Sequence, residues 1–145
     1  MRPEIWAVLT ALCWACGSLL EKKGVRLGDF TPVMGTTIRT VISMLLLLAL
    51  SYPFWGQVKS AGAKPVLLIA VGGGLIAGCL GIVFLYSALK SGQISVVLTI
   101  AFCLTPVVGT LLGFFFLEER LKLVQWLGVS LCIAGAALVT LFNDH

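Results

Sequence analysis

Long uncharged blocks of apolar residues, separated by short polar segments, dominate the chain. The fourth block shows the pattern most clearly, because residues 94–117 contain no charged side chain before the cluster that begins at Glu118. At about 1.5 Å per residue, a helix of this length spans the roughly 30 Å hydrocarbon core of a bilayer. The apolar residues show neither the alternation of a half-buried strand nor the striping of a helix with a polar face, so lipid is the expected environment.

Five such blocks occur, and each predicts a transmembrane helix. The predicted helices cover, in chain order, residues about 4–24, 32–54, 65–89, 94–117 and 123–142. Residues 25–31 are expected to form one connecting loop, and a short polar loop is expected between Lys59 and Lys64. The chain of 145 residues is therefore expected to be a single all-α integral membrane domain with five transmembrane helices.

Composition and charge agree with this class. Hydrophobic residues make up 59% of the chain and charged residues 11%, whereas soluble domains average about 25% charged residues. The net charge of +4 is dispersed between the blocks, so nucleic acid is not an expected partner, and the loop cations are expected to contact lipid headgroups. The five cysteines lie inside predicted spans and are expected to be packing residues, not a disulfide framework or a metal site.

The last two blocks carry a family pattern. The segment LTPVVGTLLGFFFLEERLKLVQWLGVSLCIAGAALV resembles the C-terminal half of the EamA domain of the drug/metabolite transporter superfamily, and FLYSALKSG, residues 84–92, resembles the family's junction between its third and fourth helices. The matching residues of the longer segment are Pro106, Gly109, Glu119, Leu121, Gln125, Trp126, Gly128 and Gly135. The resemblance implies one five-helix, half-size EamA repeat, whereas most members of the family are ten-span chains built from two such domains.

An odd number of spans bears on the assembly, because it places the two ends of the chain on opposite sides of the membrane. The side of the N-terminus carries five cations and the other side four, or five if Arg39 reaches that surface, so loop charge selects no orientation. The first set is Arg2, Lys59, Lys64, Arg120 and Lys122, and the second is Lys22, Lys23, Arg26 and Lys90. We therefore expect dual topology and an antiparallel homodimer, with a parallel dimer or a different half-size partner as alternatives.

Several small residues and one proline predict close helix packing or hinges. Pro106 lies mid-span, where it permits a kink, and Gly109 and Gly113 follow at the GxxxG spacing that lets two helix backbones approach. Gly74 and Gly78 stand at the same spacing in the third span, beside the triple glycine 72–74. These five residues are the candidates for packing or hinge positions.

Polar and aromatic residues within the spans are the candidates for a substrate path. Thr10, Trp14, Ser18 and Glu21 recur at steps of four, four and three, which places them on one face of the first helix. Arg39 lies about two turns inside the second helix, where an arginine either reaches the headgroups or serves the path. Tyr86, Thr99 and Cys103 complete the expected lining.

The chemistry present favours transport over catalysis. No histidine lies within the spans and no nucleophile has an adjacent base, so neither an enzyme nor a cofactor is expected. Glu21 is the one carboxylate on the polar face of the first helix, so either it titrates during turnover, or coupling uses another group, or transport is facilitated. We expect an exporter or other transporter of small metabolites or amphipathic compounds in a bacterial or archaeal inner membrane. An accessory or half-size flippase subunit for another membrane protein is the alternative.

Overall fold

The computed structural model describes residues 3–118 and 122–142. Within them, five helical stretches are long and apolar enough to cross a membrane, and no strand is present. The stretches are Glu4–Leu27, Pro32–Ala61, Ala63–Ser91, Ile94–Phe116 and Leu123–Leu141. The all-α, five-span fold class predicted from the sequence is confirmed. Glu119 and Leu121, which carry part of the family resemblance, lie outside the described residues, as do the loop cations Arg2 and Arg120.

The chain divides into two compact units, Met1–Ser91 and Gly92–His145. The first unit begins with α1, Pro3–Leu27, which runs three residues beyond the predicted end at residue 24. Gly24 does not end the helix. The chain reverses beyond Leu27, at Asp29, which adopts a left-handed conformation with φ 45°. The backbone N–H of Gly28 donates to the carbonyl of Gly24 at 3.0 Å, and that of Phe30 donates to the carbonyl of Val25 at 3.1 Å. These bonds cap α1 and leave a turn of only four residues, 28–31.

Helix α2, Pro32–Ser51, begins with the expected N-terminal signals. Pro32 occupies the first turn, where its missing N–H is not needed, and the Thr31 hydroxyl accepts from the Met34 N–H at 3.3 Å. Beyond Ser51 the chain stays helical through the 3₁₀ turn η1, Tyr52–Phe54, and α3, Trp55–Ala61. The polar loop expected from Lys59 to Lys64 is therefore wrong for most of its length, because only Gly62, at φ 80°, interrupts the helical backbone.

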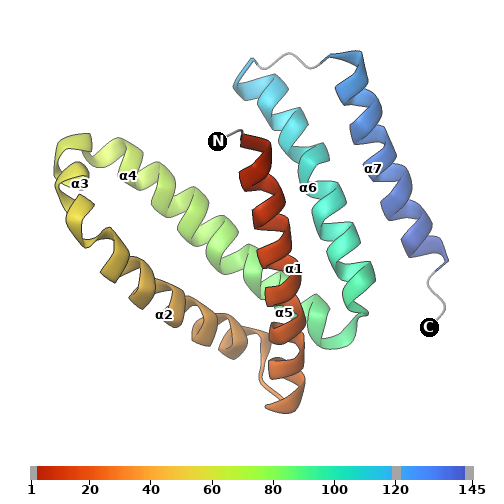
Figure 1. Ribbon diagram of the computed structural model, residues 1–145, viewed down its shortest axis with the longest axis horizontal. Helices are drawn as coiled ribbons and strands as arrows, with labels where there is room; N and C mark the ends of the chain where they lie inside the picture. Colours follow the sequence, from red (N-terminus) through yellow and green to blue (C-terminus); the bar gives the residue numbers. More distant parts are fainter. Residues whose placement is uncertain (1–2, 119–121, 143–145) are drawn as a thin grey trace. The chain divides into compact units, whose positions relative to one another are not determined.

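The third span is continuous but changes its winding. It consists of α4, Ala63–Ile69, a π-helical segment η2, Ala70–Gly81, and α5, Ile82–Ser91. Glycine makes the wide winding possible at Gly78, because a Cβ there would stand 2.6 Å from the carbonyl oxygen of Gly73. Figure 1 shows α3 joining the ends of α2 and α4 that lie far from the turn at residues 28–31.

The core of the first unit lies where α1, α2 and α5 meet, close to that turn (Figure 1). Val25, Ile82 and Tyr86 form a buried cluster, and Tyr86 is only 3% exposed. Gly35 lets the tyrosine ring lie against α2, because a Cβ at this position would stand 2.6 Å from two ring carbons. Lys90, near the end of α5, binds the turn through Asp29 Oδ1 at 2.9 Å and the Phe30 carbonyl at 3.1 Å. The three helices are thus fixed to one another at this end.

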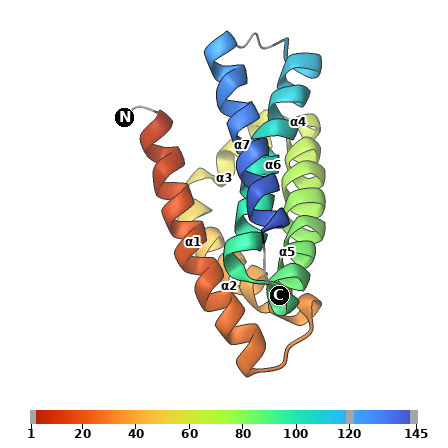
Figure 2. The same cartoon turned by 90° about the vertical axis from the view of Figure 1, so that its right-hand side faces the viewer.

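The second unit is a helical hairpin of α6, Ile94–Phe116, and α7, Leu123–Leu141. The two helices lie side by side in both views (Figures 1 and 2). Pro106 lies inside α6, and the Thr105 hydroxyl beside it donates to the Ala101 carbonyl at 2.7 Å. At the start of α7, the Gln125 side chain accepts from the Lys122 N–H at 2.8 Å and so caps the helix.

Candidate functional site

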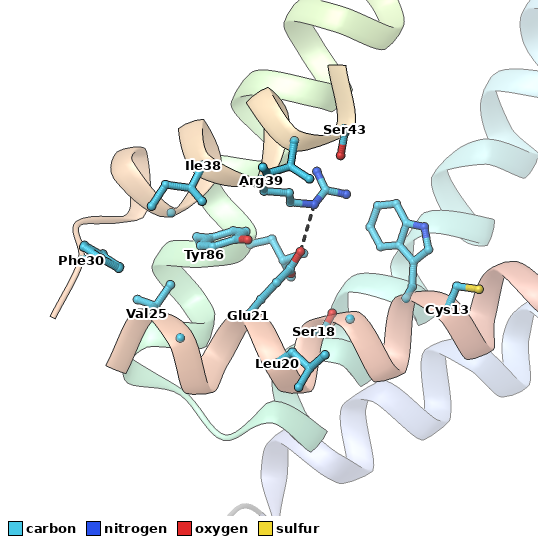
Figure 3. A pocket seen from close by; sticks show the side chains of 16 residues that line it. Cys13, Ser18, Leu20, Glu21, Val25, Phe30, Ile38, Arg39, Ser43 and Tyr86 are labelled. Carbon is cyan, nitrogen blue, oxygen red and sulfur yellow. Dashed lines mark ion pairs between the residues drawn. The ribbon is translucent and has the colours of Figure 1, made fainter. Parts of the chain in front are cut away.

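A cavity of about 610 Å³ opens between α1, α2 and α5 in the first unit (Figure 3). This volume lies within the range of roughly 300–1,000 Å³ that is usual for small-molecule sites. Five of the eight residues predicted for the substrate path line it, namely Trp14, Ser18, Glu21, Arg39 and Tyr86. The remaining walls are mostly apolar, with contributions from Leu20, Val25, Phe30, Ile38, Ile42 and Leu85.

An ion pair between α1 and α2 lies at the cavity. Arg39 Nε stands 2.9 Å from Glu21 Oε1, and the two side chains are 32% and 21% exposed (Figure 3). Glu21 is six residues from the end of α1 and Arg39 seven from the start of α2, which places them about 9 and 10 Å from the turn that joins these helices. Similar depth in neighbouring helices is what allows the pair to form. Arg39 therefore has a partner inside the span and does not depend on reaching the headgroups.

Two aromatic side chains complete the polar cluster. The guanidinium carbon of Arg39 lies 5.7 Å from the centroid of the Trp14 ring, within the range of a cation–π contact. Tyr86, on α5, also lines the cavity, and its ring points toward Glu21 in Figure 3. Side chains from three helices thus meet near the Glu21 carboxylate. The arrangement combines a fixed charge pair with aromatic faces and an apolar wall, which suits an amphipathic solute.

The other three predicted path residues are not among those that line the cavity. Thr10 is exposed on α1, and its hydroxyl donates to the Trp6 carbonyl at 2.8 Å. Thr99 and Cys103 lie on α6, in the second unit. The structure does not place any of these three in the cavity.

Apart from Arg39, sequence reasoning missed the residues of the second helix that line the cavity. Gly35, Arg39 and Ser43 all line it and recur at intervals of four, which places them on one face of α2. Only Arg39 was singled out, because its charge is unusual in a span. The same four-residue step that picked out the polar face of α1 would have found Gly35 and Ser43.

The five predicted packing or hinge positions fall into different surroundings. Gly78 faces the Gly73 carbonyl within η2, and Gly113 is buried. At Gly74 and Gly109, an added Cβ would meet no atom within 4 Å among the described residues. Pro106 lies within an unbroken α6. In the part of the chain that the structure describes, no group of three or more histidine, cysteine or acidic residues is placed to hold a metal ion.

Comparison with known proteins decides the family. The model of the EamA-like transporter family matches residues 1–141. The chain belongs to the EamA-like transporter family. Its resemblance to this family, carried in the sequence by the segments around Tyr86 and Pro106, is thereby confirmed, and the protein is an integral membrane transporter of that family.

Two relatives match this chain over very different shares of their own length. An uncharacterized transporter of a Sinorhizobium species, named for its place in the cobO 3′ region, is 30% identical over 141 residues, which cover 96% of both chains. An uncharacterized transporter of Synechocystis is 33% identical over 141 residues, which cover 94% of this chain but only 40% of the relative. No solved structure matches the chain. The match therefore extends over nearly the whole length of one relative and over less than half of the other.

Proposed function

We propose that this EamA protein transports small metabolites or amphipathic compounds and works as a dimer of five-helix halves in antiparallel orientation. The solute binds in the cavity between α1, α2 and α5, and crosses the membrane chemically unchanged. The proposed location is the cytoplasmic membrane of a bacterium or archaeon, in keeping with the bacterial sources of both relatives.

The observation that carries this proposal is the cavity itself. A charge inside a membrane span is costly, so a paired glutamate and arginine at a cavity of about 610 Å³ favour a functional role over a purely structural one. Trp14 and Tyr86 add aromatic surface beside the charge pair, and the remaining walls are largely apolar. These features fit a solute with one polar end and one apolar body.

The number of spans and the relatives support the dimer. Transporters are often built from two inverted repeats, and an odd number of spans per repeat inverts the second copy. The longer Synechocystis relative has room for a second domain, because the matched region is only 40% of its length. A chain that is a single such domain would supply the second half as another copy, inserted in the opposite direction. The balanced loop charges of this chain permit both orientations.

Flux through the purified protein tests the transport proposal. The full chain would be reconstituted alone in liposomes and offered three poorly permeant solutes with a common aromatic body: phenylalanine, phenylethanesulfonate and phenethyltrimethylammonium. Saturable, protein-dependent uptake of at least one of them is expected. Absence of uptake of all three, together with stable co-purification of a second membrane protein from native membranes, would favour an accessory subunit instead.

Cross-linking tests the dimer. Single cysteines would be placed at residue 60, in the predicted N-terminal-side surface, and at residue 91, on the opposite side, after the five native cysteines have been replaced. In native membranes, the antiparallel model predicts cross-links between residue 60 of one copy and residue 91 of another. Cross-links found only between identical positions on one side would exclude it.

A further inference from the structure

The charge balance of the cavity points to the chemical class of its solute. We propose that the cavity binds a small amphipathic monocarboxylate, whose carboxylate replaces Glu21 at the Arg39 guanidinium while Glu21 takes up one proton. This inference rests on the proposed transport function and adds the solute class and a coupled proton to it.

The charged residues that line the cavity balance each other. Among the residues that line the cavity, Arg39 carries one positive charge and Glu21 one negative charge, and they pair with each other. A charged solute must therefore compete with one member of this pair. Either a cation displaces Arg39 from Glu21, or an anion displaces Glu21 from Arg39.

The two exchanges differ in the charge that they leave behind. A guanidinium stays protonated in proteins, so a cation bound to Glu21 would leave Arg39 charged and without its partner inside the span. A displaced glutamate can instead accept a proton and become neutral. The balanced exchange is therefore an anion and one proton entering an Arg39–Glu21 pair, which yields an Arg39–solute pair and a neutral Glu21. No unpaired charge remains in the cavity.

The geometry of Arg39 favours the same exchange. Its contact with Glu21 is made through Nε, and Figure 3 shows the two terminal nitrogens pointing away from the glutamate. A planar carboxylate can approach these nitrogens and form the paired hydrogen bonds for which a guanidinium is suited. The Trp14 ring, which would otherwise attract a cationic solute, already has Arg39 at 5.7 Å from its centroid. The protein thus supplies its own cation to this aromatic face.

Two side chains from neighbouring helices surround the Glu21 carboxyl group. The charged and titratable side chains that face it are Arg39 from α2 and Tyr86 from α5, and Cys13 of its own helix lines the same cavity. A tyrosine hydroxyl can donate a hydrogen bond to either form of a carboxyl group. When the solute leaves Arg39, the proton leaves Glu21 and the ion pair forms again.

The charge, the apolar walls and the volume of the cavity limit the charge and the size of the solute. One guanidinium balances one negative charge, which favours a monocarboxylate over a doubly charged phosphate. Ile38, Ile42 and Leu85 provide apolar wall for the body of the molecule. A volume of about 610 Å³ has room for a body of the size of one aromatic ring and its side chain.

Binding of three matched probes tests the proposal. The purified full-length protein in lipid nanodiscs would be titrated at neutral pH with phenylacetate, phenethylamine and phenethyl alcohol, which share one aromatic body and differ in charge. Phenylacetate is expected to bind at least about tenfold tighter than the other two, as a hydrogen-bonded charge pair implies. A weakly buffered solution with a pH indicator should report about one proton taken up per phenylacetate bound. Binding of the amine as tight as the acid, or of the acid no tighter than the alcohol, would overturn the proposal.

Three variants assign the effect to the two charged residues. Glu21→Gln should bind phenylacetate at least as well as the wild type, because Arg39 no longer has a competing carboxylate, but without proton uptake. Arg39→Gln should lose about 10- to 100-fold in acid affinity and prefer phenethylamine, an inversion that a purely structural role for Arg39 does not produce. Arg26 is an exposed arginine in the last turn of α1 and does not line the cavity. Arg26→Gln should therefore behave as the wild type.

Arg39→Gln could fail to fold, because it leaves Glu21 charged and unpaired. Two other variants then test the proposal: Glu21→Gln keeps the arginine, and the double variant Glu21→Gln/Arg39→Gln leaves no unpaired charge in the cavity. The double variant should lose the preference for phenylacetate over phenethyl alcohol. Proton uptake that persists in Glu21→Gln would contradict the assignment. The outcome is separate from that of the transport proposal, since a protein that carries phenethyltrimethylammonium but binds phenethylamine better than phenylacetate would be a transporter with a different solute class.

Discussion

At the residue scale, Glu21 and Arg39 neutralise each other's charge inside the membrane spans. Either charge alone inside a span is unfavourable, whereas together they form a neutral pair at 2.9 Å with Tyr86 and Trp14 beside it. Because the side chains of Arg39 and Glu21 remain 32% and 21% exposed, respectively, a solute can reach the pair. The same partial exposure makes the pair weaker than one that is fully buried.

Removal of one partner should therefore destabilise the protein more than removal of both. Glu21→Gln and Arg39→Gln are each expected to cost about 1–3 kcal/mol, below the value for a fully buried pair, and the double variant is expected to recover part of this loss. Unfolding in mixed micelles with increasing sodium dodecyl sulfate measures all four proteins. Additive effects of the two substitutions would show that the pair contributes nothing to stability.

Gly35 makes the packing of Tyr86 against α2 possible. Gly35→Ala should cost about 1–3 kcal/mol, because the new Cβ would stand 2.6 Å from the ring and the tyrosine must move. Gly17→Ala is the matched control on the opposite wall, where an added Cβ meets nothing within 4 Å, and it should be neutral or slightly stabilising. Thermal unfolding of both variants in detergent checks the contrast, and equal losses would contradict this account of Gly35.

Part of the site could be predicted from single residues and spacing. The four-residue steps through Trp14 and Ser18 identified the polar face of α1, and the charge of Arg39 singled it out within an apolar block. The pairing of Arg39 with Glu21 could not be predicted, because it depends on the depth of both residues relative to a four-residue turn. The predicted turn was longer, since Val25 to Leu27 were not assigned to the helix.

At the element scale, the sequence predicted the spans but not their interruptions. Apolar blocks specify five helices because each must satisfy its backbone hydrogen bonds internally in lipid. The segment from Lys59 to Lys64 was expected to form a loop, yet residues 59–61 continue a helix, because polarity alone does not break one and only Gly62 in this segment adopts a non-helical φ of 80°. The π-helical winding of η2 left no signal in hydrophobicity, and only the glycines at Gly73 and Gly78 relate to it.

The π-helical segment should depend on Gly78. Gly78→Ala is expected to destabilise the third span by about 1–3 kcal/mol or force it toward α-helical winding, because its Cβ would stand 2.6 Å from the Gly73 carbonyl oxygen. Gly74→Ala, four residues earlier in the same segment, meets no atom within 4 Å and should have little effect. Amide hydrogen exchange across residues 70–81 reports the change. Identical exchange in both variants would show that Gly78 has no special role.

At the scale of the whole molecule, a half-size EamA chain with balanced loop charge is suited to insertion in both directions. The loop cations are nearly equal in number on the two sides, so a small change should decide the orientation. This property belongs to no single helix, and it links the span count to the proposed antiparallel pair.

Removal of two lysines should fix the orientation. Lys59→Gln together with Lys64→Gln lowers the count on the side of the N-terminus from five to three, so the side of Lys22 and Lys23 should become cytoplasmic in most molecules. Labelling of a single cysteine at residue 60 from each side of intact cells measures this. The parent protein should label from both sides and the variant mainly from the outside. Labelling of the parent from one side only would exclude dual insertion.

The central claim is that a solute crosses the membrane through the cavity between α1, α2 and α5. The most direct test is the uptake of phenylalanine, phenylethanesulfonate and phenethyltrimethylammonium by liposomes that contain the wild type, Trp14→Ala or Trp6→Ala. Both tryptophans lie on α1, but only Trp14 lines the cavity. For each solute carried, Trp14→Ala should reduce uptake at least about tenfold, as expected for lost aromatic contact in a binding site, while Trp6→Ala should leave it unchanged. Uptake that survives in Trp14→Ala at the wild-type rate would contradict the claim.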